Sequence, residues 1–302
     1  MSTLRASIKS MRLRTLPLST GGVLLGILLA AADFKVSLPV AVLTVVTTVC
    51  LQILSNLSNE LGDVLHGTDT ADRVGPTYGL NGGELTIPGM KRLVGLFVVL
   101  CIVSGTAMTW LSFGTLLDLT PIMVLLLGAA AIGGAMRYTL GRNPYGYRGL
   151  GDLYVFLFFG IVAVTGAYFV ASHVLYWRLL LPAASVGFLS IGVLNVNNIR
   201  DMETDAGTRV TVAIRLGEKR AKIYQTVLVV LGWVCMVAYC LLRIFDPWHY
   251  LFVLTLPLFI LHLRGVWKRS GRDLDPMLPL LVLSTFLFCL LAGAGFLVYL
   301  IK

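Results

Sequence analysis

Charged residues are scarce in this sequence. Asp, Glu, Lys and Arg make up 13% of its 302 residues, whereas hydrophobic residues make up 57%. The mean hydropathy of +0.86 is far above that of water-soluble domains. The composition therefore excludes a soluble enzyme and a disordered chain, and it indicates an integral membrane protein.

Paired cysteines and intramembrane charges are also lacking. The five cysteines all lie in apolar runs and form no C-x-x-C pair, which excludes a disulfide framework and a cysteine-based zinc site. No Asp, Glu, Lys or Arg lies near the middle of an apolar run. Secondary transporters usually carry ionisable residues there, so the absence argues against a membrane transporter, the strongest alternative from another class.

Long apolar runs are what the sequence does contain. A helix needs about 20 apolar residues to cross a hydrocarbon core of about 30 Å. Nine runs meet this requirement, near residues 16–32, 38–57, 93–117, 120–136, 153–172, 178–199, 223–242, 249–263 and 277–300. We predict an all-α, polytopic membrane helical bundle with nine transmembrane helices, forming a single domain over residues 1–302.

Basic residues are distributed unevenly around these runs. If the N-terminus is cytoplasmic, 20 of the 24 Lys and Arg residues fall on the cytoplasmic side; the exceptions are Lys35, Arg178, Arg243 and Lys302. The positive-inside rule therefore predicts a cytoplasmic N-terminus. It also explains the net charge of +9 without a nucleic-acid partner. The long polar connections lie on the same side, where we expect the chemistry.

Two of these connections begin with similar polar triplets. The triplets are Asn56, Asn59 and Asp63 in the first connection and Asn198, Asp201 and Asp205 in the second. Both have the spacing i, i+3, i+7, which puts three side chains on one face of a helix that leaves the membrane. The match suggests an internal repeat of about four helices.

The triplets have the chemistry of a magnesium site. Carboxylate and carboxamide oxygens are hard ligands, and Mg²⁺ usually takes one or two protein carboxylates and completes its shell with water and substrate phosphate. We predict that Asn59 and Asp63 on one helix hold Mg²⁺ on one side of a diphosphate. Asp201 and Asp205 are expected to do so on the other side.

Basic and amide side chains near the triplets are candidates for binding the diphosphate itself. They are Arg14, Asn56, Arg137, Arg142, Asn198 and Arg209. Guanidinium groups can neutralise phosphate oxygens that metal ions leave bare. Arg209 follows the second triplet directly, and we assign it to catalysis with Asp63 and Asp201.

The two segments around the triplets resemble a known family. NLSNELGDVLHGTDTADRVGP and NNIRDMETDAGTRVTVAIRLG are similar to the first and second aspartate-rich motifs of the UbiA superfamily of intramembrane prenyltransferases. Two further segments, MRLRTLPLS and YGYRGLGDLYVFLFFG, resemble the branch that acts on 1,4-dihydroxy-2-naphthoate in menaquinone synthesis. The resemblance extends over nearly the whole chain, including the nine spans.

This resemblance implies a Mg²⁺-dependent enzyme that ionises a polyprenyl diphosphate and joins the allylic cation to an aromatic ring. In the naphthoate branch, CO₂ and diphosphate leave and demethylmenaquinone forms. By residue match, Asn59, Asp63 and Asp69 belong to the first metal site, and Asp201 and Asp205 to the second. Menaquinone chemistry favours a bacterial plasma (inner) membrane, with the active site open to the cytoplasm.

Two departures from the superfamily pattern are visible. Glu60 stands where the first motif usually has Asp, so we expect it to be a surface charge rather than a direct ligand. Arg209 takes the place of the lysine in the usual Gly-Lys pair of the second motif, which keeps the charge but changes its geometry.

The aromatic acceptor is expected near the connection before the fifth span. The candidates are Tyr138, Asn143, Tyr145, Tyr147, Arg148 and Asp152. Aromatic rings can stack on a naphthoate or stabilise a cation, although tyrosine at a membrane interface also serves as an anchor. An acceptor other than the naphthoate, such as 4-hydroxybenzoate or homogentisate, is the alternative within the superfamily.

Overall fold

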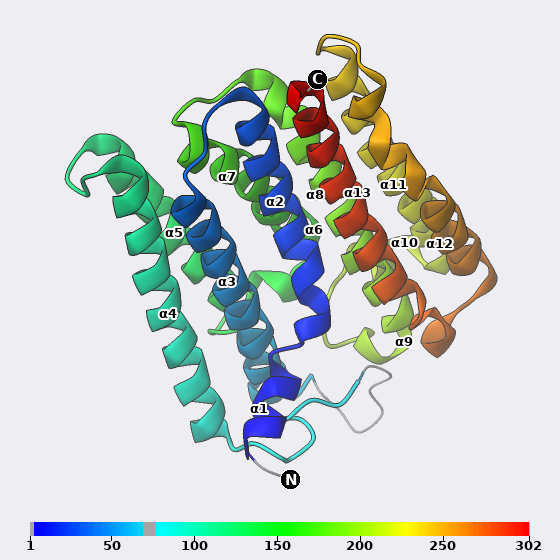
Figure 1. The fold of residues 1–302 in the computed structure, drawn as a ribbon. Helices are drawn as coiled ribbons and strands as arrows, with labels where there is room; N and C mark the ends of the chain where they lie inside the picture. The colour runs from blue at the N-terminus through cyan, green and yellow to red at the C-terminus, as the bar shows by residue number, and fades with distance from the viewer. Residues whose placement is uncertain (1–2, 69–75, 302) are drawn as a thin grey trace.

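The computed structural model describes residues 3–68 and 76–301 of the chain. Over these residues the protein is helical, with no strand beyond an isolated bridge between Arg148 and Val210. Nine of its helical segments are long and apolar enough to cross a membrane, which confirms the predicted fold class. The described parts of the chain begin and end at opposite ends of the bundle (Figure 1), as an odd number of spans requires.

The nine spans follow one another along the chain. They are Leu4–Asp33 (α1, Thr3–Ser10; η1, Leu13–Thr15; α2, Leu16–Asp33), Leu38–Leu65 (α3), Ile87–Phe113 (α4), Leu119–Arg137 (α5), Gly151–Ser172 (α6, Gly151–Val155; η3, Phe156–Val162; α7, Ala163–Ser172), Trp177–Arg200 (η4, Trp177–Leu179; α8, Leu180–Arg200), Glu218–Leu241 (α11), Pro247–Lys268 (η5, Pro247–Thr255; α12, Leu256–Lys268) and Gly271–Val298 (η6, Gly271–Leu274; α13, Met277–Ile301). Short helices η2 (Tyr145–Tyr147), α9 (Met202–Asp205) and α10 (Val212–Leu216) lie in the connections.

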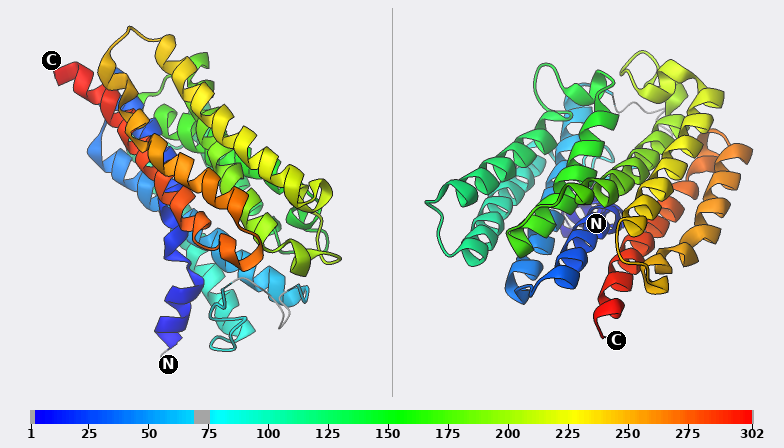
Figure 2. Two further views of the ribbon diagram at one scale, coloured as in Figure 1. Left: turned by 90° about the vertical axis from the view of Figure 1, so that its right-hand side faces the viewer. Right: turned by 90° about the horizontal axis from the view of Figure 1, so that it is seen from above.

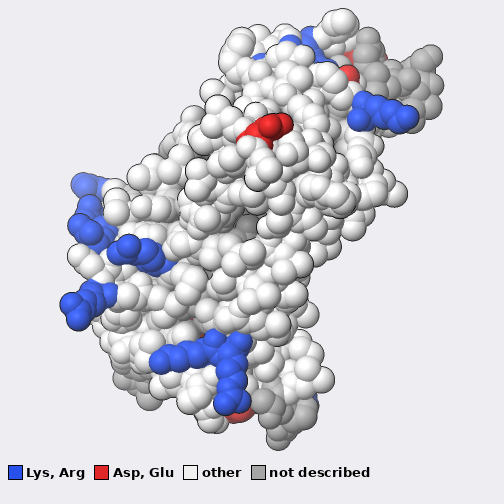
Figure 3. Space-filling model, turned by 90° about the vertical axis from the view of Figure 1, so that its left-hand side faces the viewer, with Lys and Arg blue, Asp and Glu red and all other residues white. Residues whose placement is uncertain are grey.

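The bundle has two flanks with the N-terminal helices between them. Seen along the bundle in Figure 2, α4 and α5 form one flank and the helices from α11 to α13 form the other. One hydrophobic core joins α2, α7, α8, α11, η5 and α13, and a second core joins α1, α3 and α4. On the face shown in Figure 3, Lys and Arg side chains lie mostly toward the left and lower edges, around a broad area without charges.

The third span differs from its expected position near residues 93–117. Its helix begins at Ile87, because the Thr86 side chain accepts a hydrogen bond from the Gly89 amide (3.2 Å) and Pro88 occupies the first turn. The helix ends at Phe113, because Gly114 adopts a left-handed conformation with φ of 71°. Capping residues, not hydropathy, therefore set these two ends.

The first span also starts earlier than expected, at Leu4. It is broken at Arg12, whose φ of 51° lies in the left-handed region. The break lets α1 pack on the connection after α3, where Ser10 Oγ accepts a hydrogen bond from the Gly79 amide (3.1 Å). The N-terminal helix thereby covers the same end of the bundle as the first acidic motif.

The fifth span contains a π-helical turn, η3, in its middle. Its backbone packs directly against α8 at Gly160, where a Cβ atom would lie 2.6 Å from both the Ala183 carbonyl oxygen and the Gly187 Cα. Such contacts fit only glycine, so these two helices approach more closely than larger side chains allow.

This contact gives the first testable prediction. Gly160→Ala should lower the free energy of unfolding by about 1–3 kcal/mol, because the added methyl group meets backbone atoms that have no room to move. Thermal unfolding in detergent measures the effect. Gly95→Ala in α4 is the matched control, since open space surrounds its Cβ position; equal melting temperatures for both variants would contradict the prediction.

Candidate active site

The two acidic motifs meet at one end of the bundle. Helices α3 and α8 both end there (Figure 1), as their parallel direction in the sequence predicts. Arg209 connects the motifs: its Nη2 lies 3.4 Å from Asp63 Oδ1, and its Nε lies 3.3 Å from Asp205 Oδ1. Both carboxylates are buried. One guanidinium group therefore balances two carboxylates from segments far apart in the chain.

Tyr147 belongs to this same cluster. Its hydroxyl group donates a 2.7 Å hydrogen bond to Asp63 Oδ1, and the Thr68 hydroxyl donates another of 3.2 Å. The Tyr147 carbonyl accepts a hydrogen bond from the Val210 amide (3.0 Å), next to Arg209. The connection before the fifth span is thus held between the two motifs. The structure places Tyr147 on the Asp63 carboxylate, whereas we expected it to contact the acceptor.

Burial and neighbouring carboxylates shift the pKa values of Tyr147, Tyr138 and Arg209. Burial raises the pKa of Tyr147 above its ordinary value, and the neighbouring Asp63 carboxylate raises it further. Burial also raises the pKa of Tyr138 to about 12. For Arg209, burial lowers the pKa, but the Asp63 and Asp205 carboxylates outweigh it and leave the pKa raised. At neutral pH the site therefore holds neutral phenols, which donate hydrogen bonds, and a permanent cation.

Asp201 is held differently from Asp63 and Asp205. Arg200 donates hydrogen bonds to both carboxylate oxygens of Asp201, with Nε 2.7 Å from Oδ1 and Nη2 2.6 Å from Oδ2. Arg200 Nη1 also donates to Asp275 Oδ1 (2.9 Å), and the Arg200 side chain is only 3% exposed. We expected no role for Arg200 from the sequence. Its position beside Asp201 was visible, but the direction of its side chain was not.

The second triplet does not lie on one continuous helix, contrary to expectation. Helix α8 ends at Arg200, and Asp205 closes the separate short helix α9. Backbone hydrogen bonds from Asp201 to Asn197 (3.0 Å) and from Asp205 to Asp201 (2.8 Å) still follow the helical pattern across the junction. The first triplet lies within α3, as predicted.

The triplet asparagines have separate environments. Asn56 donates to the Met11 carbonyl and to Thr15 Oγ1, both at 2.9 Å, and so ties α3 to the N-terminal segment. Asn59 lines a large cavity and accepts a 3.4 Å hydrogen bond from Thr139 Oγ1. Asn198 lines a small pocket together with Tyr138 and Asp152.

Several expected site residues lie away from the carboxylates. Arg14, Arg137, Arg142, Asn143 and Arg148 are exposed, and in the described part of the chain none of these four arginines forms an ion pair with a motif carboxylate. Arg14 donates to the Tyr78 hydroxyl (2.9 Å). Asp152 accepts from the Tyr224 hydroxyl (2.9 Å), and Tyr145 lines the large cavity. The predicted ligand Asp69 lies outside the described residues.

Glu60 is not the surface charge that the sequence suggested. It is fully buried, and its Oε1 accepts hydrogen bonds from the Leu80 amide (2.6 Å) and the Asn81 amide (3.2 Å). The longer arm of glutamate, compared with aspartate, thus anchors the connection after α3. This role needs a partner 20 residues away in the chain, which no local pattern reveals.

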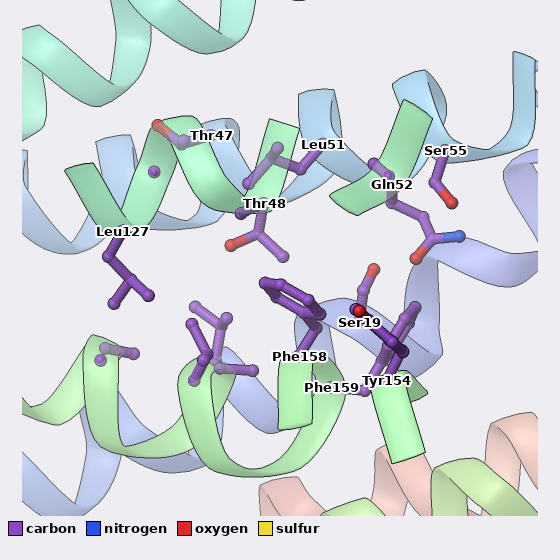
Figure 4. Close-up of a pocket in the computed structure, with 18 of the residues that line it drawn as sticks. Ser19, Thr47, Thr48, Leu51, Gln52, Ser55, Leu127, Tyr154, Phe158 and Phe159 are labelled. Carbon is purple, nitrogen blue, oxygen red and sulfur yellow. The ribbon is translucent and has the colours of Figure 1, made fainter. Parts of the chain in front are cut away.

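A cavity of about 370 Å³ extends from the acidic end into the bundle. Asn59 and Tyr138 line it near the motifs, and residues of α2, α3, α5, η3 and α7 line the rest. Figure 4 shows two of its walls, with Thr48, Gln52 and Ser55 of α3 facing Phe158 of η3. The volume lies in the range of small-molecule sites. Of the aromatic residues that line the cavity, only Tyr138 and Tyr145 were predicted from the sequence. The other aromatic residues lie inside an apolar run, where they do not stand out.

Comparison with known proteins identifies the family. The model of the UbiA prenyltransferase family matches residues 20–282. The chain belongs to the UbiA prenyltransferase family. It is 38% identical to the 1,4-dihydroxy-2-naphthoate octaprenyltransferase of Escherichia coli over 92% of this chain and 88% of that protein. It is 35% identical to the protein of the same name from Mycobacterium tuberculosis over 92% of each chain.

Solved UbiA structures share the fold of this UbiA family member. A UbiA homolog from Aeropyrum pernix aligns over 99% of both chains with a TM-score of 0.69 at 18% identity. A UbiA homolog from Archaeoglobus fulgidus, bound to GPP and Mg²⁺, aligns over 95% of this chain and 99% of that chain, with a TM-score of 0.63 at 16% identity.

The donor set of this UbiA-family site fits Mg²⁺. Its buried carboxylates already require a positive partner, which Arg209 supplies. In the described part of the chain no three acidic, histidine or cysteine side chains converge. Asp63, Asp205 and the Asn59 amide offer the hard oxygen ligands that Mg²⁺ takes, one or two carboxylates at a time, with water and phosphate completing its shell. Asp63 with Asn59, and Asp205, are the groups that would hold it.

Removing the bridged carboxylates tests this site. Asp63→Asn and Asp205→Asn should each lower kcat at least a hundredfold, because an amide keeps the shape of the carboxylate but not the charge that binds Mg²⁺. Prenyl transfer by purified variants measures the loss. Asp118→Asn, at an exposed position before α5, is the matched control and should keep full activity. Normal turnover by either site variant would refute the assignment.

Replacing Asp201 by alanine should destabilise the fold more than replacing Asp63 by alanine. Asp201→Ala removes the bidentate partner of the buried Arg200 and leaves it, as its only carboxylate contact in the described part of the chain, Asp275, whose side chain is 49% exposed; the variant should lower the free energy of unfolding by about 3 kcal/mol. Asp63→Ala leaves Arg209 paired with Asp205 and should cost less. Melting temperatures in detergent compare the two variants. A smaller loss for Asp201→Ala than for Asp63→Ala would show that the Arg200 pair is not a main stabilising contact.

Proposed function

We propose that the protein transfers a polyprenyl group from polyprenyl diphosphate to 1,4-dihydroxy-2-naphthoate, with loss of CO₂ and diphosphate. The observation that carries the proposal is the pair of acidic motifs, joined by Arg209, at the mouth of a largely apolar cavity. The names of the two bacterial relatives support the choice of acceptor.

The charged end of the bundle is suited to bind the diphosphate leaving group. Mg²⁺ held by Asp63, Asn59 and Asp205 would neutralise charge on the diphosphate and so make it a better leaving group. Arg209 is placed to donate hydrogen bonds to phosphate oxygens, since its guanidinium group is charged at any physiological pH and lies between the two motifs. Tyr147 holds the Asp63 carboxylate in position through its hydroxyl group. These groups are fixed before substrate arrives, so little reorganisation opposes the ionisation.

The apolar cavity protects the allylic cation from water. Its lining is mainly aliphatic and aromatic, and exclusion of water prevents hydrolysis of a reactive intermediate. Leu127 and Gly128 of α5 both line the cavity and are exposed, and Pro121 is the only buried residue of this helix. A polyprenyl tail too long for 370 Å³ can therefore pass beside α5 into the surrounding lipid.

Bond formation at the ring completes the reaction. A carbon–carbon bond forms between the allylic carbon and the naphthalene ring, and the carbon–oxygen bond to diphosphate breaks. The carboxylate leaves as CO₂, and its bonding electrons remain in the ring. No electron is removed overall, so the product is demethylmenaquinone in its reduced form.

The orientation and location follow from the charges. The connections at the motif end carry most of the basic residues, so we place this end in the cytoplasm and the bundle in the bacterial plasma membrane. Water-soluble 1,4-dihydroxy-2-naphthoate and released diphosphate would then enter and leave on the cytoplasmic side.

A membrane-fraction assay tests the function. Membranes from a host without its own naphthoate prenyltransferase, supplied with octaprenyl diphosphate, 1,4-dihydroxy-2-naphthoate and Mg²⁺, should yield octaprenyl-demethylmenaquinone by mass spectrometry. Addition of EDTA should abolish the product, and excess Mg²⁺ should restore it. Parallel reactions contain 4-hydroxybenzoate or homogentisate; product from one of these and none from the naphthoate would overturn the proposed acceptor but keep the mechanism.

A further inference from the structure

The large cavity has two unlike walls. In Figure 4, side chains of α3 approach from one side, and Tyr154, Phe158 and Phe159 of the fifth span approach from the other. The α3 wall is polar and the facing wall is aromatic. A pocket for a hydrocarbon tail alone would need no polar wall.

The polar wall is a stripe along one face of α3. Thr48, Gln52 and Ser55 follow one another at the helical spacing i, i+4, i+7, and the stripe continues to Asn59 at the acidic end. Thr48 satisfies its hydroxyl group within the helix, by donating to the Thr44 carbonyl (2.8 Å). Polar side chains inside a membrane bundle are costly unless they have partners.

In the part of the chain that the structure describes, two groups of this stripe still lack a partner, as does the neighbouring Thr47 hydroxyl of α3, which also lines the cavity. Ser55 makes no hydrogen bond within the described residues, although it lines the cavity. The Gln52 amide nitrogen donates to Asn56 Oδ1 (3.2 Å), but no hydrogen bond in the described part of the chain reaches the Gln52 carbonyl oxygen. The wall therefore offers a hydroxyl group and an amide oxygen to a ligand.

The aromatic wall is a continuous stack. Tyr145 and Tyr154 stack with ring centroids 3.7 Å apart, and the Tyr154 and Phe158 rings are nearly parallel, at 17°, with centroids 6.2 Å apart. All three rings line the cavity. Phe158 also lies against Gly134 of α5, where a Cβ atom would come within 3.2 Å of its ring. The ring is thus held in place from outside the cavity.

The π-helical turn contributes to this wall. Phe158 and Phe159 of η3 both line the cavity, while Gly160 packs on the α8 backbone. A π-helical turn is rare and occurs frequently at functional sites. Here it combines a close helix contact on one side with two aromatic rings on the other.

We propose that the aromatic acceptor binds between these two walls, with its ring face on Tyr154 and Phe158 and its oxygen substituents on Gln52 and Ser55. This inference rests on the proposed function. A bicyclic hydroxy-acid has flat faces that stack on aromatic rings and a polar edge that forms hydrogen bonds. An isoprenoid has no atom to pair with Gln52 or Ser55. The subsite lies deeper in the bundle than the exposed Asn143 and Arg148, which we first expected to bind the acceptor.

Kinetics on five variants test the subsite. Ser55→Ala and Phe158→Leu should each raise the KM for 1,4-dihydroxy-2-naphthoate roughly fivefold, because one hydrogen bond or one stacking contact is lost. The KM for polyprenyl diphosphate should stay within about twofold. Ser104→Ala and Phe188→Leu are matched controls, since both side chains are half-buried and do not line the cavity. Phe158→Tyr keeps the ring and should restore the naphthoate KM.

A binding measurement separates this inference from the proposed function. Titration of 1-hydroxy-2-naphthoate into purified protein without Mg²⁺, followed by the fluorescence of the naphthoate, should give a Kd that rises in Ser55→Ala and Phe158→Leu but not in the controls. Unchanged Kd and KM values in both variants would overturn the subsite even if wild-type protein prenylates the naphthoate. So would an increased KM for polyprenyl diphosphate alone, which would assign the walls to the isoprenoid. Absence of prenylation despite the expected binding pattern would overturn the proposed function only.

Discussion

The positive charge of Arg209 between Asp63 and Asp205 is the interaction on which the open end of the bundle depends. Two buried carboxylates near a membrane are tolerated only with a cationic partner. The partner lies 146 residues from Asp63 in the chain, so the pair joins the first half of the bundle to the second. Tyr147 contacts both motifs, through its hydroxyl group on Asp63 and its carbonyl on the Val210 amide, and three connections are thereby fixed around one site.

Buried polar groups behind the second motif are likewise paired with one another. Asn195 donates to Gln225 (3.0 Å), the Gln225 amide meets the His262 ring (3.1 Å), and the other ring nitrogen of His262 meets the Met277 carbonyl (3.1 Å). This chain of contacts links α8, α11, α12 and α13. Because each polar group in such a network needs its neighbour, the network holds α8, and with it the start of the second motif, in a fixed position.

Prediction from sequence succeeded where the signal is local. Apolar runs located the nine spans, and helical spacing placed the first triplet on α3. It failed where a side chain depends on a distant partner. Glu60 is buried because the Leu80 amide, 20 residues away, donates a hydrogen bond to it. Arg200 is adjacent to Asp201, but its side chain also binds Asp275, 75 residues further along the chain. The polar stripe of α3 was not predicted, because its residues alternate with apolar ones in the sequence. The structure shows that they all line one cavity.

The boundary between the charged end and the cavity fixes where the reaction takes place. The allylic carbon is bonded to diphosphate on one side and to the hydrocarbon tail on the other, so in the proposed reaction it would lie where the acidic motifs meet the apolar lining, near Asn59 and Tyr138. The attacked ring carbon must come within bonding reach of that point, so the acceptor shares the cavity with the first part of the tail. A cavity of about 370 Å³ leaves little further room. The remaining tail must therefore leave sideways, and the exposed lining residues of α5 mark the side on which it does so.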